Sequence, residues 1–78
     1  MNTFLRLKKV MDAMGISRST VYLRIRQGLM TPPVKLGERC SAWPSREIEM
    51  IIAAQISGKP NGVIKALVNQ LVTDRGAT

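Results

Sequence analysis

The stretch from Gly15 to Gly28, GISRSTVYLRIRQG, gathers side chains whose types and spacing could serve a function. Three of the chain's twelve basic residues stand here, among two serines, a threonine and a tyrosine. An arginine can form two parallel hydrogen bonds to the edge of a guanine, and serine or threonine hydroxyls can bond a base or a phosphate. This stretch therefore offers hydrogen bonding to an anionic partner rather than the making or breaking of covalent bonds.

The rest of the chain holds no pattern typical of an enzyme. It has no histidine and a single cysteine, Cys40, so neither a usual zinc site nor an internal disulfide is expected. Paired carboxylates at catalytic spacing, a phosphate-binding glycine loop and a nucleophile beside a base are all missing. Asp12 and the three glutamates are interpreted as solvated. We expect no enzymatic activity, no metal and no cofactor.

Composition points to one small basic domain. The 78 residues are 45% hydrophobic and carry a formal net charge of +7. Such a balance suits a polyanionic partner, either nucleic acid or an acidic membrane face. No apolar run reaches the roughly 18 residues of a membrane span, and the N-terminus does not resemble a signal peptide. We expect a cytoplasmic protein of a bacterium, located at the nucleoid when bound.

Two short helices are predicted on either side of Gly15. Apolar residues recur at helical spacing over 5–14, and glycine can end that helix because it readily adopts the left-handed conformation. Ser17 is a favourable N-cap for a second helix over 18–27, which Gly28 ends. Two helices joined by a glycine-containing turn form a helix-turn-helix, although a plain helical hairpin has the same pattern. The charge of the second helix favours the former.

The second helix divides into two faces. Val21 and Ile25 lie one turn apart and are expected to face the first helix, with Arg24 at the flank of this seam. The outer face then carries Arg18, Ser19, Tyr22, Leu23 and Arg26. Helices that enter the major groove of DNA need this division, and their exposed N-terminal amides favour a phosphate.

A β-hairpin is predicted after the second helix. The two prolines at 32 and 33 exclude a helix, and the alternation that follows predicts strands over 34–43 with a tip at Gly37–Cys40. Val34, Leu36 and Trp43 are expected to close the core. Lys35 and Arg39 place positive charge on this hairpin, as on a wing that reaches a minor groove or the phosphates beside it.

Two more helices follow. Ser45 is the expected N-cap of the third, whose residues Ile48, Ile51, Ile52 and Gln55 share a face. The sequence SGKPNG breaks the chain over 57–62, and a fourth helix is predicted over about 62–73. Its apolar stripe comprises Val63, Ile64, Leu67, Val68, Leu71 and Val72. This stripe either thickens a thin core or forms a self-association surface.

The ordered signals RLKKV, GISRSTVY, PPVKLGER and WPSREIEMII resemble those of the AlpA-like phage regulators. These are winged-helix proteins related to the DNA-binding domains of the MerR superfamily and to phage excisionases. The resemblance covers roughly residues 6–54 and implies DNA binding by the second helix and the wing. The positions it assigns to DNA contact are Ser17, Arg18, Ser19, Thr20, Tyr22, Arg26, Lys35 and Arg39. The chain departs from the family pattern at Arg24, which stands where an apolar residue is commoner, and at Leu23, which has moved outward.

These observations predict a mainly α fold with a small β-hairpin. Residues 5–57 form the winged helix-turn-helix, 58–73 a C-terminal amphipathic helix that packs or self-associates, and 74–78 a frayed tail. The predicted function is sequence-specific binding of double-stranded DNA, as a transcriptional regulator or an excisionase of a prophage or genomic island. Lys8 and Lys9 are expected to join the wing in phosphate contacts, whereas Arg18, Ser19, Tyr22 and Arg26 are expected to read bases in the major groove.

The partners expected besides DNA are an integrase and further copies of the chain, as a homodimer or a cooperative array on DNA; no membrane is expected. The alternative function is a protein-interaction module that binds an integrase or another regulator through the C-terminal helix.

Overall fold

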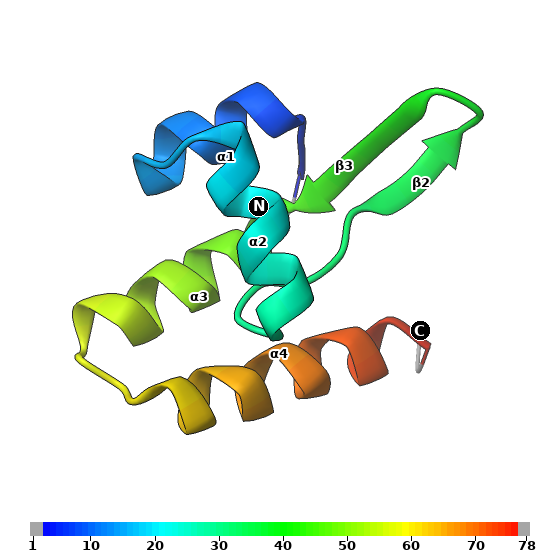
Figure 1. The fold of residues 1–78 in the computed structure, drawn as a ribbon. Coiled ribbons are helices and arrows are strands. Elements are labelled where there is room, and N and C mark those ends of the chain that lie inside the picture. Colours follow the sequence, from blue (N-terminus) through cyan, green and yellow to red (C-terminus); the bar gives the residue numbers. More distant parts are fainter. Residues whose placement is uncertain (1–2, 77–78) are drawn as a thin grey trace.

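The computed structural model describes residues 3–76 (Figure 1). Within this range lie four helices and three short antiparallel strands, which confirms a mainly α winged helix-turn-helix with a C-terminal helix. In chain order the elements are β1 (Phe4–Leu5), α1 (Leu7–Met14), α2 (Arg18–Gln27), β2 (Val34–Gly37), β3 (Cys40–Pro44), α3 (Ser45–Ile56) and α4 (Asn61–Gly76). None of the helices within residues 3–76 is long and apolar enough to cross a membrane.

The helix-turn-helix forms as the turn residues predict. Gly15 adopts φ 65° at the end of α1, and its amide donates to the carbonyl of Met11. Ser17 caps α2, since its Oγ accepts from the backbone N–H of Thr20 at 3.3 Å. Gly28 adopts φ 77° after α2, which spans the predicted residues 18–27. A residue with a Cβ would be strained at either glycine.

The sheet contains one strand that the sequence did not predict. Its order is β1-β3-β2, and β1 pairs Leu5 with Trp43. The first helix was expected from residue 5, but the backbone at Phe4–Leu5 is extended because it pairs with β3. Two residues are too few to show a strand periodicity.

The wing formed by β2 and β3 matches the predicted hairpin, except at Leu36. A bulge interrupts the ladder between Lys35 and Gly37, and a bulge breaks the alternation of faces. Leu36 is therefore 46% exposed and does not close the core, as had been expected. Val34 is half-buried and Trp43 is buried.

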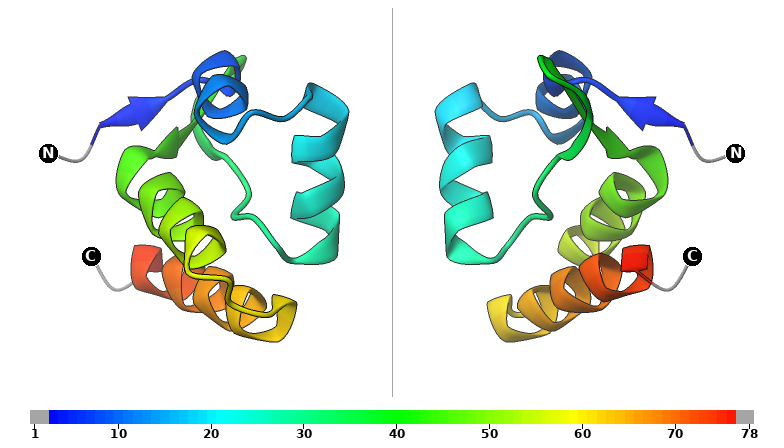
Figure 2. Two further views of the ribbon diagram at one scale, coloured as in Figure 1. Left: turned by 90° about the vertical axis from the view of Figure 1, so that its left-hand side faces the viewer. Right: turned by 90° about the vertical axis from the view of Figure 1, so that its right-hand side faces the viewer.

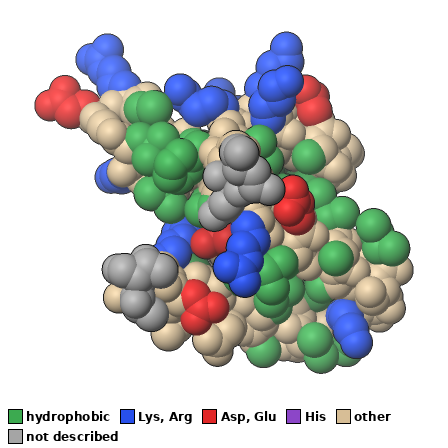
Figure 3. Space-filling model, turned by 180° about the vertical axis from the view of Figure 1, so that it is seen from behind, with side chains coloured by type: hydrophobic (Ala, Val, Ile, Leu, Met, Phe, Trp, Pro, Cys, Tyr) green, Lys and Arg blue, Asp and Glu red, His purple; other side chains and the backbone are tan. Residues whose placement is uncertain are grey.

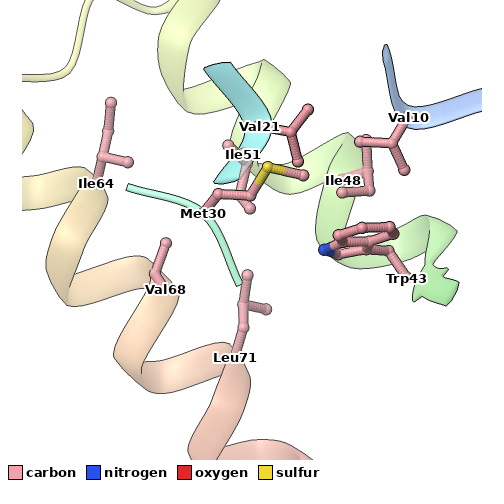
Figure 4. Close-up of a cluster of buried hydrophobic side chains, with 9 residues drawn as sticks. All are labelled: Val10, Val21, Met30, Trp43, Ile48, Ile51, Ile64, Val68 and Leu71. Atoms are coloured by element: carbon pink, nitrogen blue, oxygen red, sulfur yellow. The ribbon is translucent and has the colours of Figure 1, made fainter. Parts of the chain in front are cut away.

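The core draws side chains from every helix and from β3 (Figure 4). The inner seam of α2 is confirmed, with Val21 buried and Ile25 half-buried against it. Trp43 is 1% exposed, and its Nε1 donates to the carbonyl of Thr31 at 2.8 Å. The buried cluster comprises Val10, Val21, Met30, Trp43, Ile48, Ile51, Ile64, Val68 and Leu71.

Helix α3 begins differently from the prediction. Ser45 is its first helical residue, and Pro44 occupies the N-cap position without a side-chain cap. The expected Ser45 cap is therefore wrong. Its Oγ instead accepts from the backbone N–H of Thr3 at 2.8 Å, while its own N–H donates to the Thr3 carbonyl at 2.6 Å. The Ser45 side chain thus contacts the N-terminal segment, which is remote in sequence, instead of capping its own helix.

Helix α4 folds back under α3, and both ribbon views show the two helices side by side (Figure 2). The apolar stripe is divided: Ile64, Val68 and Leu71 are buried, whereas Val63 and Val72 are partly exposed. The helix also continues to Gly76, past the predicted end near residue 73. Of the predicted frayed tail, 74–76 are helical and 77–78 lie outside the described residues.

An ion pair fastens the end of α4. Arg75 donates from Nε and Nη2 to the two carboxylate oxygens of Glu47, at 2.8 and 2.5 Å, and from Nη2 to the carbonyl of Pro32 at 2.8 Å. The Glu47 side chain is only 8% exposed, so the expectation that all three glutamates are solvated is wrong at this position. Its partner lies 28 residues away, which no local pattern reveals.

The ion pair predicts a large effect on stability. Arg75→Met leaves the Glu47 carboxylate buried without its cation, so the free energy of unfolding is expected to fall by about 3 kcal/mol. Urea denaturation followed by Trp43 fluorescence measures the loss. Lys65→Met, which removes a cation from an exposed position of α4, is expected to change it by less than about 0.5 kcal/mol.

Replacing both partners tests the cause. Because two apolar residues leave no unpaired charge, Glu47→Met combined with Arg75→Met is expected to recover much of the lost stability. A double variant as unstable as Arg75→Met alone contradicts this account.

Candidate nucleic-acid interface

Helix α2 stands at an outer edge of the molecule, with its outward side covered by no other element (Figure 2). The structure places the predicted outer residues there: Arg18, Ser19, Tyr22, Leu23 and Arg26 are all exposed. Tyr22 is 42% exposed and Leu23 is 43% exposed, so neither of these large side chains belongs to the core. Arg24 is half-buried at the flank, as predicted.

The first turn of α2 is organised by its hydroxyl groups. Besides accepting from the Thr20 N–H, Ser17 Oγ lies 2.9 Å from Thr20 Oγ1 and 3.2 Å from Ser19 Oγ. The predicted cap is confirmed, and it involves two of the eight residues that the resemblance assigned to DNA contact. Ser17 is exposed although it forms the cap, whereas Thr20 is half-buried.

Arg18 and Tyr22 form a pair on the surface of α2. The guanidinium carbon of Arg18 lies 6.0 Å from the centre of the Tyr22 ring, at the outer limit of a cation–π contact. The two residues are one helical turn apart, so the contact holds both side chains over the first half of the helix. Arg26, one turn further on, is exposed near the C-terminal end of α2.

The wing contributes the remaining predicted residues. Lys35 on β2 and Arg39 in the turn before β3 are both exposed. Seen from behind, several Lys and Arg side chains lie along the upper edge of the molecule, over the wing and the side of α1 (Figure 3). Lys8 and Lys9, expected to join in phosphate contacts, are exposed on α1.

A hollow lies between the starts of α1 and α2 and strand β3. Its volume is about 340 Å³, and its lining comprises Arg6, Leu7, Lys8, Arg18, Tyr22, Ser41 and Trp43. Sequence reasoning assigned no role to Arg6 or Ser41. The sequence shows that RLKK, residues 6–9, is basic, but only the packing of the helices places it opposite α2 and β3.

The fold and this surface define a winged helix-turn-helix protein with a polar, basic outer face. The model of the family described as prophage CP4-57 regulatory protein (AlpA) matches residues 3–56. The chain is also 42% identical, over 59 residues, to uncharacterized protein ORF88 of Enterobacteria phage P4, an alignment that covers 76% of this chain and 67% of the relative. No solved structure gave a significant match. The chain belongs to the AlpA family of prophage regulatory proteins, which confirms the resemblance.

The cap of α2 generates a prediction about stability. Ser17→Ala removes the acceptor of the Thr20 N–H and is expected to lower the free energy of unfolding by about 1 kcal/mol. Ser17→Asp keeps an acceptor at the cap and should stay close to the original stability. Thermal and urea unfolding of the two variants measures the difference, and equal losses in both would contradict the capping role.

Proposed function

We propose that this protein binds double-stranded DNA in a sequence-specific manner, with α2 in the major groove and the wing against the flanking backbone. In this proposal it acts as a transcriptional regulator or an excisionase of a prophage or genomic island, and not as an enzyme. The observation that carries the proposal is the outward face of α2, which is exposed and polar while the opposite face is buried.

Spacing along α2 supports contact with several bases. Ser19, Tyr22 and Arg26 follow each other at intervals of three and four residues, so they share one stripe of the helix. The major groove is about 12 Å wide and admits one helix. Arg26 is suited to a two-pronged contact with guanine, and the exposed Leu23 can contact a thymine methyl group.

The charges on and near α2 support the proposal that this helix faces DNA. Helix α2 contains three arginines and no acidic residue. Glu47, one of the five acidic residues, is paired with Arg75 away from α2 and therefore does not oppose a polyanion there. The exposed cations of the wing and of α1 lie on either side of the recognition helix, where the phosphates of a groove would be.

The packing of α4 gives less support to the alternative, a module that binds proteins through this helix. Three residues of its apolar stripe are buried in the core, which leaves Val63 and Val72 partly exposed and Leu67 half-buried. An integrase, or further copies of the chain on adjacent DNA sites, are proposed as additional partners of the DNA-bound protein.

Binding to the promoter and attachment-site DNA of the element that encodes the protein tests the proposal, with a scrambled duplex as competitor and a salt series. The logarithm of the binding constant is expected to fall with the logarithm of salt concentration, with a slope of about −0.9 for each phosphate contacted. A preference for the promoter indicates a regulator and a preference for the attachment site an excisionase. Equal, weak binding to specific and scrambled DNA contradicts the proposal.

One substitution tests the orientation of α2. Arg26→Ala is expected to cost about 1–3 kcal/mol of binding to the preferred site because a contact with a base is lost. Binding to scrambled DNA should change far less. Lys59→Ala, which removes one exposed positive charge between α3 and α4, is the matched control and should leave the ratio of specific to scrambled affinity unchanged. Fluorescence anisotropy with both duplexes measures that ratio.

A further inference from the structure

We propose that the hollow between α1, α2 and β3 binds one phosphate of the DNA backbone. This inference rests on the proposed DNA binding and deepens it. It changes the role of Arg18 from contact with a base to contact with a phosphate, and it adds Arg6 and Ser41 to the interface. It likewise assigns the Tyr22 hydroxyl to the phosphate rather than to a base.

The charge of the hollow is the first reason. Arg6, Lys8 and Arg18 come from separate places, namely the residue before α1, the first turn of α1 and the first residue of α2. None of the lining residues is acidic, and within residues 3–76 no carboxylate forms an ion pair with any of these three cations. Three like charges beside one hollow repel each other, and a bound anion relieves that repulsion.

Neutral hydrogen-bond donors complete the lining. Tyr22 and Ser41 each carry a hydroxyl group, and the cation–π contact with Arg18 restrains the tyrosine. The start of α1 also lies here, and its N-cap residue Arg6 forms no side-chain cap, in contrast to Ser17 at α2. The first amides of α1 have no partner within the helix, and such amides favour an anion.

Trp43 ties the hollow to the core. The residue is among those that line the hollow but is only 1% exposed. Its Nε1–H is already donated to Thr31 and is not available to an anion. Arg6 is adjacent to Leu5, which pairs with Trp43 in the sheet, and this pairing sets the position of Arg6 relative to β3.

The position of the hollow matches a backbone phosphate better than a base. Its lining residues stand at the starts of α1 and α2 and on β3, at the N-terminal end of the recognition helix. A helix in the major groove has phosphates along both walls of the groove. A phosphate bound at the N-terminal end of α2 would fix the depth and the register of the helix, so that Ser19 and Arg26 meet the same base pairs each time.

Affinity for two duplexes distinguishes a phosphate contact from a base contact. Arg6→Ala and Arg18→Ala are each expected to weaken binding to the preferred and the scrambled duplex by the same factor, about tenfold. Each should also make the salt slope shallower by about 0.9. Lys59→Ala is the matched control, since Lys59 is an exposed cation between α3 and α4, outside the hollow and the candidate interface, and its effect should be smaller. Because all three residues are exposed, the variants should unfold at the temperature of the original protein.

A second experiment identifies which phosphate of the DNA occupies the hollow. Neutral methylphosphonate links are introduced one at a time along the preferred site. One position is expected to weaken binding of the original protein about tenfold, yet to have little further effect on Arg6→Ala or Arg18→Ala. Inorganic phosphate tests the other source of the same chemistry. If millimolar phosphate competes with DNA for the original protein but not for Arg18→Ala, the result supports the site. If phosphate binds in the hollow but neither variant changes DNA binding, the inference is overturned.

The outcomes separate this inference from the proposed function. If the original protein prefers its site but Arg18→Ala lowers the ratio of specific to scrambled affinity as Arg26→Ala does, Arg18 contacts a base and the inference is wrong. If Arg6→Ala changes the affinity for neither duplex more than Lys59→Ala does, the hollow binds no phosphate. If the original protein itself shows no preference for any duplex, the proposed function fails and this inference fails with it.

Discussion

The burial of Trp43 is the interaction on which the rest of the structure depends. This one residue joins parts of the chain that share no local signal: its backbone pairs with Leu5 in β1, its indole donates to the Thr31 carbonyl after α2, and it belongs with Ile48 of α3 to the core cluster. A domain of 78 residues has a thin core, so a single large side chain contributes much of its buried area. Trp43 is also among the residues that line the hollow beside α2, so the residue that stabilises the fold also belongs to the candidate interface.

Helix α4 completes this core and carries its own electrostatic attachment. Ile64, Val68 and Leu71 cover the side of the cluster that the helix-turn-helix and the sheet leave open. At its far end, Arg75 contacts both Glu47 and the Pro32 carbonyl, and thereby links α3, α4 and the segment that leads from α2 into the wing. Helix α4, which lies away from the candidate DNA surface, therefore stabilises the relative position of α2 and the wing.

Much of the fold could be predicted because its signals are local. Gly15, Ser17 and Gly28 define α2 through turn and cap chemistry, and the alternation after the prolines defines the wing. The failures involve contacts between distant residues. Ser45 bonds Thr3 across 42 residues, Glu47 meets Arg75 across 28, and β1 exists only because it pairs with β3. The outer face of α2 was predictable from helical periodicity. The hollow was not, because Arg6, Arg18 and Ser41 come together only once α1, α2 and β3 have packed.

The separation of the two faces of α2 has an evolutionary consequence. Its inner seam is part of the core, whereas Ser19, Tyr22 and Arg26 are exposed and belong to no buried cluster. Exposed substitutions away from caps and buried networks change stability by only about 0.5 kcal/mol. Selection can therefore exchange Arg26 almost without cost to folding, whereas changes at Ser19 and Tyr22 also touch the Ser17 cap and the contact with Arg18. Under the proposed function, such a scaffold can acquire a new target sequence by few substitutions while its fold is retained.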